Sequence, residues 1–435
     1  MRINKISLAC LTLCGSALMV ACGGGSSSAP PATTQQIQAP TMQGAIVNSY
    51  IAKAVVTLDQ NDNGECDLIE PKVVSGRNGE YAFPGLGEHA VCSSGGINVA
   101  TGLAFVGALK GPKGGGPITP LTTLVAALLA GNLNPTPAQI SAAKNRIETQ
   151  LSLPAGSINL DPVAAIASNP KLEQTNAAIQ VMMRTITNSV IALAGVDSTS
   201  NTPALQIQVY DNAVRAIANT LAAPGAQRVD LTTVASSDGT SNFVRASVSQ
   251  TVANAKASSN SSLLKAEAFA ALQNLSPENA ASFVTSNIST LVQNTAQATP
   301  TAAGIAAAQK NSLSSTTLVN AIETIAGVVP SLFSTLNTAS TAQIAALAAI
   351  LSPSASVVAS SPVIVTNTAA LSTALDLATS PNLTVNLAAV TQILVEAVDS
   401  PPLGPVVLSV DSFPTPVAAP LPPPIVITRP ITGGG

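Results

Sequence analysis

The feature that most constrains this chain is a recurring pair, a capping residue followed by proline, in the part of the sequence after Ile118. A side-chain oxygen at the cap accepts a hydrogen bond from the first turn of a helix, and proline suits the first helical position because no N–H is needed there. The pairs are Thr119-Pro120, Thr136-Pro137, Asp161-Pro162, Thr202-Pro203, Ser276-Pro277 and Thr299-Pro300. We therefore predict a helix at each pair, and an α-helical region of one or two domains over residues 118–400.

The spacing of apolar residues in this region agrees with helices that pack on one another. Apolar residues recur every three or four positions, which places them on one face of an amphipathic helix. The clearest faces are Ile140, Ala143, Ile147 and Leu151, and Val284, Ile288, Leu291 and Val292. Gln139 also stands three residues after Thr136, which is a capping-box spacing. Residues 401–435 are rich in proline instead, and we expect an extended or disordered tail there.

Residues 41–117 have a different pattern, with short strand-like runs between glycine-rich turns. Ala54 to Leu58 is apolar and β-branched, and Glu80 to Phe83 alternates, which places Tyr81 and Phe83 on one face. Asn78-Gly79 precedes the second run and predicts a hairpin. We expect a small antiparallel β-sandwich over 41–117, with Gly107 to Gly116 as a linker to the helices.

The scarcity of charge resembles that of a membrane protein, because only 9% of the residues are charged against roughly 25% in soluble domains. A membrane-spanning helix needs a run of about 18 or more apolar residues. The apolar residues after position 21 are instead interleaved with Ser, Thr, Asn and Gln. No transmembrane helix is predicted there.

The N-terminus has the layout of a removable export signal. Arg2 and Lys5 precede an apolar stretch from Ile6 to Ala21 that is too short to span a membrane stably. The end of that stretch, Leu18-Met19-Val20-Ala21-Cys22, resembles the lipobox of bacterial lipoproteins, in which the cysteine is lipidated and becomes the new N-terminus.

This resemblance implies a signal peptide over 1–21, a lipid on Cys22 and a flexible linker over 22–40. The resemblance also implies that the protein binds the membrane through its lipid anchor. Gly23 after the cysteine implies sorting to the outer membrane if the host is Gram-negative. The alternative is an ordinary signal peptide with a coincidental cysteine.

Two cysteines remain in the mature chain, Cys66 and Cys92, because Cys10 and Cys14 leave with the signal. Exported proteins fold in an oxidising compartment, where an even pair of cysteines forms a disulfide by default. We therefore predict a disulfide between Cys66 and Cys92, with a pair of free buried thiols as the alternative.

A twelve-residue segment from Asp59 to Glu70 has the spacing of a calcium loop. Calcium takes six to eight oxygen ligands, and a glycine at the sixth position lets the chain turn around the ion. Asp59, Asn61, Asn63 and Glu70 are the expected side-chain ligands, Glu65 a backbone ligand, and Asp67 a ligand through water. The alternative is a solvated Asp/Asn turn between two strands.

A second resemblance rests on the run from Gly44 to Asp59, on Glu70-Pro71 and on Asn78 to Phe83. These segments resemble the carboxypeptidase-regulatory-like, transthyretin-like β-sandwich modules of bacterial surface proteins. The loop is similar to those of dockerin-like domains, since a strand and not a helix enters it. The resemblance covers about a fifth of the chain and implies a structural or adhesive module.

Several function classes fit the sequence poorly. The net charge is −3 and no Lys/Arg cluster is present, so nucleic acid is not an expected partner. His89 is the only histidine, which leaves a single candidate base for Ser-His or Cys-His catalysis. Zinc would need four ligands from one histidine and two cysteines. We expect a surface or half-buried histidine.

We therefore expect a protein of the cell envelope that binds an unknown protein or envelope polymer, and not an enzyme. The alternative is an envelope hydrolase with an unrecognised active site in the helical region. Its carboxylates would come from Asp161, Glu173, Asp211 and Glu396 if these converge in a cleft.

Overall fold

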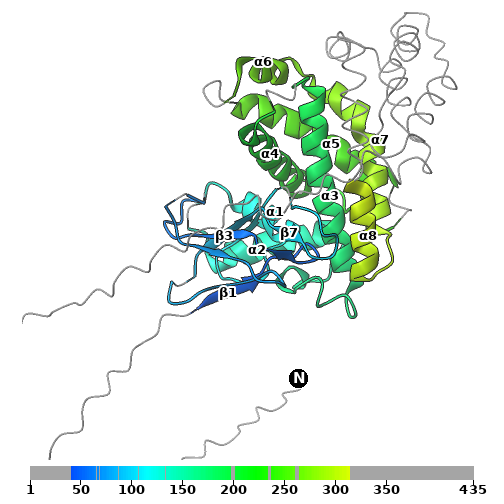
Figure 1. Cartoon of the computed structure of the whole chain (residues 1–435). Helices are drawn as coiled ribbons and strands as arrows, with labels where there is room; N and C mark the ends of the chain where they lie inside the picture. The colour runs from blue at the N-terminus through cyan, green and yellow to red at the C-terminus, as the bar shows by residue number, and fades with distance from the viewer. Residues whose placement is uncertain are drawn as a thin grey trace, which may run out of the picture. The chain divides into compact units, whose positions relative to one another are not determined.

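The computed structural model describes residues 41–313, apart from 65, 68, 87, 106, 133, 197–200, 234–236 and 260–263. Within these residues, short antiparallel strands come first and helices follow (Figure 1). The expected signal over 1–21, Cys22, the linker over 22–40, Glu65, the helical region beyond 313 and the tail over 401–435 lie outside the described residues.

The strands form three antiparallel sheets. One has four strands in the order β4-β3-β6-β8, and the others pair β1 with β5 and β2 with β7. Their bounds are β1 Met42–Ala45, β2 Ile51–Ala52, β3 Val55–Asp59, β4 Lys72–Val74, β5 Glu80–Phe83, β6 Ala90–Ser94, β7 Ile97–Asn98 and β8 Ala108–Gly111. The prediction of antiparallel β structure before the helices is confirmed.

The predicted hairpin at Asn78-Gly79 is wrong, because the strands on either side of it belong to different sheets. β4 pairs with β3, whereas β5 pairs with β1. A wider turn is closed by a bond from Gly76 N to Glu80 O, and the Glu80 carboxylate accepts from Asn78 N. This turn sends Tyr81 and Phe83 into the core instead of back along β4.

The predicted linker over Gly107 to Gly116 is also partly wrong, because β8 lies within it and pairs with β6. The backbone of Lys110 in β8 bonds to helix α1: its N–H donates to Thr123 Oγ1 over 2.9 Å, and its carbonyl accepts from Thr122 Oγ1 over 3.0 Å. Strand and helix are therefore tied together directly.

Within the described residues the helical region contains eight α-helices and one 3₁₀ helix. Their bounds are α1 Pro120–Leu129, α2 Pro137–Gln150, η1 Ser157–Asn159, α3 Pro170–Leu193, α4 Pro203–Ala222, α5 Ser237–Ser258, α6 Ala266–Asn274, α7 Pro277–Ala296 and α8 Ala302–Leu313. Helix α3 packs against α4, α7 and α8, and α5 packs against α4 and α7. Among the described residues no helix is both long and apolar enough to cross a membrane.

Four of the six cap-proline pairs begin helices as predicted, at Thr119, Thr136, Thr202 and Ser276. Asp161 accepts backbone bonds from Val163 and Ala164 but closes only a turn, so the helix predicted there is absent. After Thr299-Pro300 the helix begins late, at Ala302.

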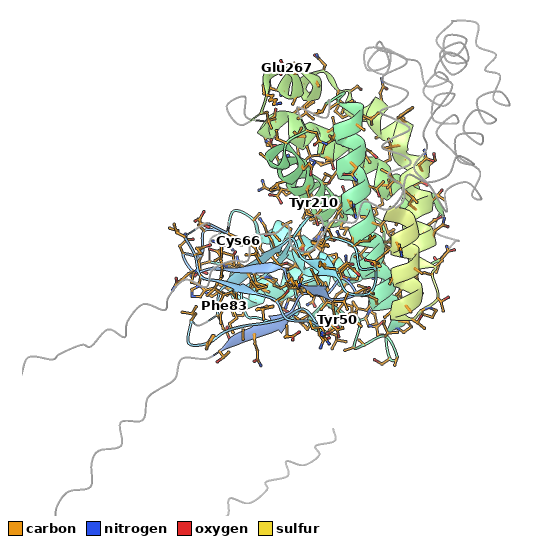
Figure 2. The ribbon with its side chains drawn as sticks, viewed as in Figure 1. Tyr50, Cys66, Phe83, Tyr210 and Glu267 are labelled. Atoms are coloured by element: carbon orange, nitrogen blue, oxygen red, sulfur yellow. A yellow bond between two sulfur atoms is a disulfide. The ribbon has the colours of Figure 1, made fainter. Side chains whose placement is uncertain are left out.

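Two apolar cores fill the described part of the chain, one for the strands and one for the helices. The strand core takes Met42, Tyr81 and Phe83 from the β1–β5 pair, and Val56, Leu58, Val91 and Leu109 from the four-stranded sheet. The helical core includes Ile147 and Leu151 of the first predicted apolar face and Val284, Ile288 and Val292 of the second. Figure 2 labels Phe83 in the first core and Tyr210 in the second.

Candidate metal-binding loop

The segment from Asp59 to Glu70 connects two paired strands. Asp59 is the last residue of β3, and Glu70 comes two residues before β4. Thr57 pairs with Lys72 in the ladder, and Leu58 N donates to Pro71 O over 3.0 Å. The antiparallel pairing therefore brings both ends of the loop together, with Asp59 and Glu70 buried where they meet.

The Asp59 carboxylate organises the first half of the loop. Its Oδ1 accepts from Asn63 N over 3.0 Å and its Oδ2 from Gly64 N over 2.8 Å. Gly64 has a φ of +81°, a left-handed conformation that glycine adopts without strain. Burial raises the pKa of Asp59, against the two backbone N–H groups that lower it, and the charges of Glu70 and Asp62 raise it further. A cation would relieve this repulsion.

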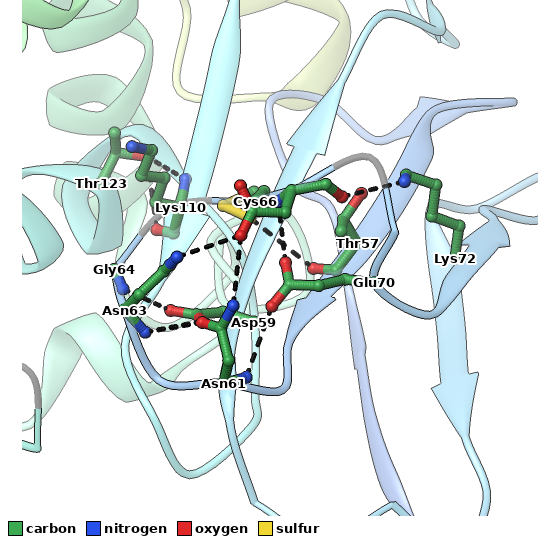
Figure 3. The surroundings of a disulfide bond; sticks show 12 residues. Thr57, Asp59, Asn61, Asn63, Gly64, Cys66, Glu70, Lys72, Lys110 and Thr123 are labelled. Carbon is green, nitrogen blue, oxygen red and sulfur yellow. Dashed lines mark hydrogen bonds between the residues drawn. A yellow bond between two sulfur atoms is a disulfide. The ribbon is translucent and has the colours of Figure 1, made fainter.

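The Glu70 carboxylate closes the second half of the loop (Figure 3). Its Oε1 accepts from Asn61 N over 3.4 Å, and its Oε2 accepts from Asp67 N over 2.8 Å. The carboxylate of Glu70, at the end of the loop, thus accepts hydrogen bonds from the backbone N–H groups of the third and ninth loop residues, Asn61 and Asp67. The loop is wrapped around its own terminal side chains.

Asp67 forms hydrogen bonds with the two other predicted ligands, Asn61 and Asn63. Its Oδ2 accepts from Asn61 Nδ2 over 3.1 Å and from Asn63 Nδ2 over 3.0 Å. The structure therefore brings together five of the six predicted ligand residues. Both amides turn nitrogen toward Asp67, so binding calcium requires each to turn over and present its oxygen, because calcium takes only oxygen ligands.

The side chains of the loop are oxygen donors of the kind that calcium takes. Among the described residues, no group of three or more His, Cys, Asp or Glu side chains lies close enough to hold a metal ion, and this includes Asp59, Asp67 and Glu70 as the structure places them. The loop contributes Asp59, Asp67 and Glu70 together with two amides, which is the mixed oxygen set of a calcium loop. These residues would hold the ion, and the ion would neutralise their carboxylates.

A disulfide between Cys66 and Cys92 joins the loop to β6, as predicted (Figure 3). Cys92 pairs with Thr57 in the ladder, so the bridge ties the middle of the loop to the strand beside its entrance. This cross-link restricts the loop whether or not an ion is bound.

Asp62 is the residue of the loop that the sequence analysis missed. Its carboxylate bonds to His89 Nδ1 over 3.0 Å and to Lys113 Nζ over 3.4 Å. The His89 side chain is 20% exposed, so the expected half-buried histidine is confirmed. Asp62 stands at the fourth position of the loop, which supplies no ligand, and no local pattern predicts its two distant partners.

The loop also forms one wall of a cavity of about 120 Å³. Asp59 and Asp62 line it from the loop, Lys110 from β8, and Asp211 and Arg215 from α4. Charges of both signs therefore face the cavity. A change in the loop would alter this surface directly.

Two carboxylates of the alternative hydrolase interpretation, Asp161 and Glu173, lie close enough for the charge of Asp161 to raise the pKa of Glu173. Asp161 accepts a bond of 3.0 Å from Tyr50 Oη, and Glu173 accepts from Ser49 and Asn176. Asp211 lines the cavity beside the loop, and Glu396 lies outside the described residues. Among known proteins, no family model, no curated protein and no solved structure matches the chain.

Proposed function

We propose that this protein is a lipid-anchored protein of the bacterial cell envelope, with a calcium-stabilised β-module that supports a helical body for binding or scaffolding. The observation that carries the proposal is the closed loop, in which Asp59 and Glu70 hold the backbone of Asn61, Asn63 and Asp67. The lipid on Cys22 provides the membrane anchor, and the partner is a protein or envelope polymer.

The packing of the strands supports a sandwich-type module. The β1–β5 pair and the four-stranded sheet bury side chains in a single core, which is how two sheets of a sandwich are held together. Tyr81 and Phe83 lie edge to face in that core, with ring centroids 6.1 Å apart. Such a module stiffens the chain without providing an active site.

The connection between strands and helices supports a structural role for the loop. Val47 N donates to Ile118 O, and Ile118 N donates to Ala45 O, both over 2.8 Å. Because the strands are bonded in this way to the segment that starts α1, an ion that rigidifies the loop also stabilises the surface presented to a partner.

The calcium part is tested by thermal unfolding of the full chain in calcium, in magnesium and in chelator. We expect calcium to raise Tm and magnesium to have little effect, because magnesium keeps several waters and fits a ready octahedral site. Glu70→Gln should abolish the calcium response. Asp230→Asn, which changes a carboxylate bonded to Lys171 and not in the loop, should retain it. An unchanged Tm in calcium, or a full response in Glu70→Gln, would overturn the calcium part.

The anchor is tested by cell fractionation of a Cys22→Ser variant. We expect the wild type in the membrane fraction with a mature N-terminus at Cys22, and the variant unprocessed or soluble. A variant that matures normally and stays in the membrane contradicts the anchor. Protease treatment of intact cells then distinguishes surface display from a periplasmic orientation.

A further inference from the structure

The cavity beside the loop has one wall on the four-stranded sheet, on the face opposite to the strand core. Thr57 of β3 pairs with Cys92 of β6, and Cys92 pairs with Lys110 of β8. Side chains alternate between the two faces of a strand. Because Leu109 belongs to the strand core, Lys110 stands on the opposite face, where it lines the cavity together with Cys92.

Helix α4 forms another wall of the same cavity. Asp211, Val214 and Arg215 line it, and their spacing of three and four residues places them on one face of the helix. The helix comes close to β8, since a Cβ on Gly107 would lie 3.1 Å from the ring of Tyr210. Charged side chains from the sheet and from the helix therefore line one space.

Three charged side chains of the cavity already have partners within the protein. Asp59 accepts hydrogen bonds from two backbone N–H groups of its own loop. Asp62 forms an ion pair of 3.4 Å with Lys113. These three groups are engaged by the loop and its surroundings.

The other three charged side chains, Lys110, Asp211 and Arg215, are not engaged. None of them forms an ion pair or a side-chain hydrogen bond with another described residue. Asp211 and Arg215 stand four residues apart on α4, a spacing at which opposite charges usually pair, yet they stay apart. Lys110 and Asp211 are half-buried and Arg215 is exposed. Two positive charges and one negative charge are thus available to a ligand.

Helix α1 supplies an apolar part of the lining, and the space is small. Ala126, Ala127 and Leu129 line the cavity from α1. A cavity of about 150 Å³ holds one benzene molecule, so a volume of about 120 Å³ admits a molecule of that size or a smaller one. Nucleotides and sugars exceed it.

We propose that this cavity binds a small free α-amino acid in its zwitterionic form, of the size of glycine, alanine or serine. Lys110 and Arg215 hold the carboxylate through charge-assisted hydrogen bonds, Asp211 holds the ammonium group, and the α1 surface accommodates the short side chain. This site goes beyond the proposed function, because it requires neither the lipid nor the calcium ion.

The three available charges select a zwitterion over simpler ligands. A simple anion would leave Asp211 without a partner, and its charge would be repelled by that carboxylate. A simple amine would leave Lys110 and Arg215 unpaired and would be repelled by both. A zwitterion pairs with all three side chains at once, and the short distance between its two charges suits a cavity of this volume.

The proposal is tested by calorimetric titration of the full chain, in chelator, with L-alanine, propionate and ethylamine. Propionate lacks the ammonium group of alanine and ethylamine lacks its carboxylate, whereas both keep the short carbon chain. We expect alanine to bind, and the other two to bind more weakly by about tenfold or more, because each loses a hydrogen-bonded charge. Propionate or ethylamine binding as tightly as alanine, or no binding of alanine, would overturn the proposal.

Two variants assign the charges to their residues. Asp211→Asn should weaken alanine by about tenfold without weakening propionate, whereas Arg215→Gln should weaken both. Glu267→Gln and Arg245→Gln change exposed residues of α6 and α5 and should bind alanine as the wild type does. Wild-type affinity for alanine in both Asp211→Asn and Arg215→Gln contradicts the site. The comparison of the three ligands on the wild type remains decisive if a variant does not fold.

Discussion

The Ser49 hydroxyl donates a hydrogen bond of 3.3 Å to Oε1 of Glu173 and thereby joins the segment after β1 to helix α3. Ser49 and Tyr50 both have a φ of 58°, in the left-handed region that residues other than glycine seldom adopt. Tyr50 in turn donates to Asp161. Side-chain bonds to the helical region thus hold an unfavourable backbone in place.

Glu173 predicts a pH dependence of stability. Burial raises its pKa to about 8, the bonds from Asn176 and Ser49 oppose that shift, and Asp161 adds to it. Between the unfolded value of 4.5 and about 8, the folded state holds a proton that the unfolded state has lost. Stability should therefore fall as pH rises through this window, by at most about 1.4 kcal/mol per pH unit.

Glu173→Gln removes this ionisation and keeps an amide that accepts from Ser49. We expect the variant to equal the wild type near pH 5 and to exceed it at pH 9, measured by urea unfolding across that range. Glu267→Gln, on an exposed part of α6 (Figure 2), is the matched control and should follow the wild type. A Glu173→Gln curve parallel to that of the wild type contradicts a buried protonated carboxyl.

The features that the sequence predicts correctly are those that depend on residues close together along the chain. Thr119 and Thr136 could be predicted as caps because each bonds within three residues of itself. The proximity of the loop side chains could be predicted for the same reason, since Asp59 to Glu70 is contiguous in the sequence, whereas their role as calcium ligands stays a prediction. Such signals depend on spacing alone.

Features that depend on partners far along the chain could not be predicted. Asp161 carries the same cap-proline signal as Thr119, yet its other carboxylate oxygen bonds to Tyr50, 111 residues away. Asn78-Gly79 indicated a hairpin, but β5 pairs with β1 instead of β4.

The disulfide predicts a loss of stability on its removal. Cys66 and Cys92 are 26 residues apart, and closing a loop of this order stabilises a domain by about 3 kcal/mol. We expect the double variant Cys66→Ser, Cys92→Ser to unfold at a lower temperature and to bind calcium more weakly, by calorimetry. Reducing agent should reproduce the loss in the wild type and leave the double variant unchanged. A wild type insensitive to reduction contradicts this prediction.

The two capping boxes predict unequal costs for the same substitution. Thr119 is 1% exposed and exchanges bonds with Thr122, whereas Thr136 is exposed and exchanges bonds with Gln139. Thr119→Ala should cost about 2 kcal/mol and Thr136→Ala about 0.5–1 kcal/mol. Chemical unfolding of both variants measures the difference. Equal losses would show that burial of the cap does not matter here.

Gly44 predicts a loss of stability from a single methyl group. A Cβ at this position would lie 2.0 Å from Gly116 O and 2.6 Å from Tyr81 Oη, and Tyr81 Oη itself donates to Gly116 O over 3.0 Å. Gly44→Ala must therefore push β1 away from the segment that leads to α1, at a cost of about 1–3 kcal/mol. Gly239→Ala, in α5, meets no atom within 4 Å and should be neutral or stabilising by up to about 1 kcal/mol. Urea unfolding of the two variants should move the midpoint in opposite directions or only for Gly44→Ala. A wild-type midpoint in Gly44→Ala would mean that β1 does not pack this closely against Gly116.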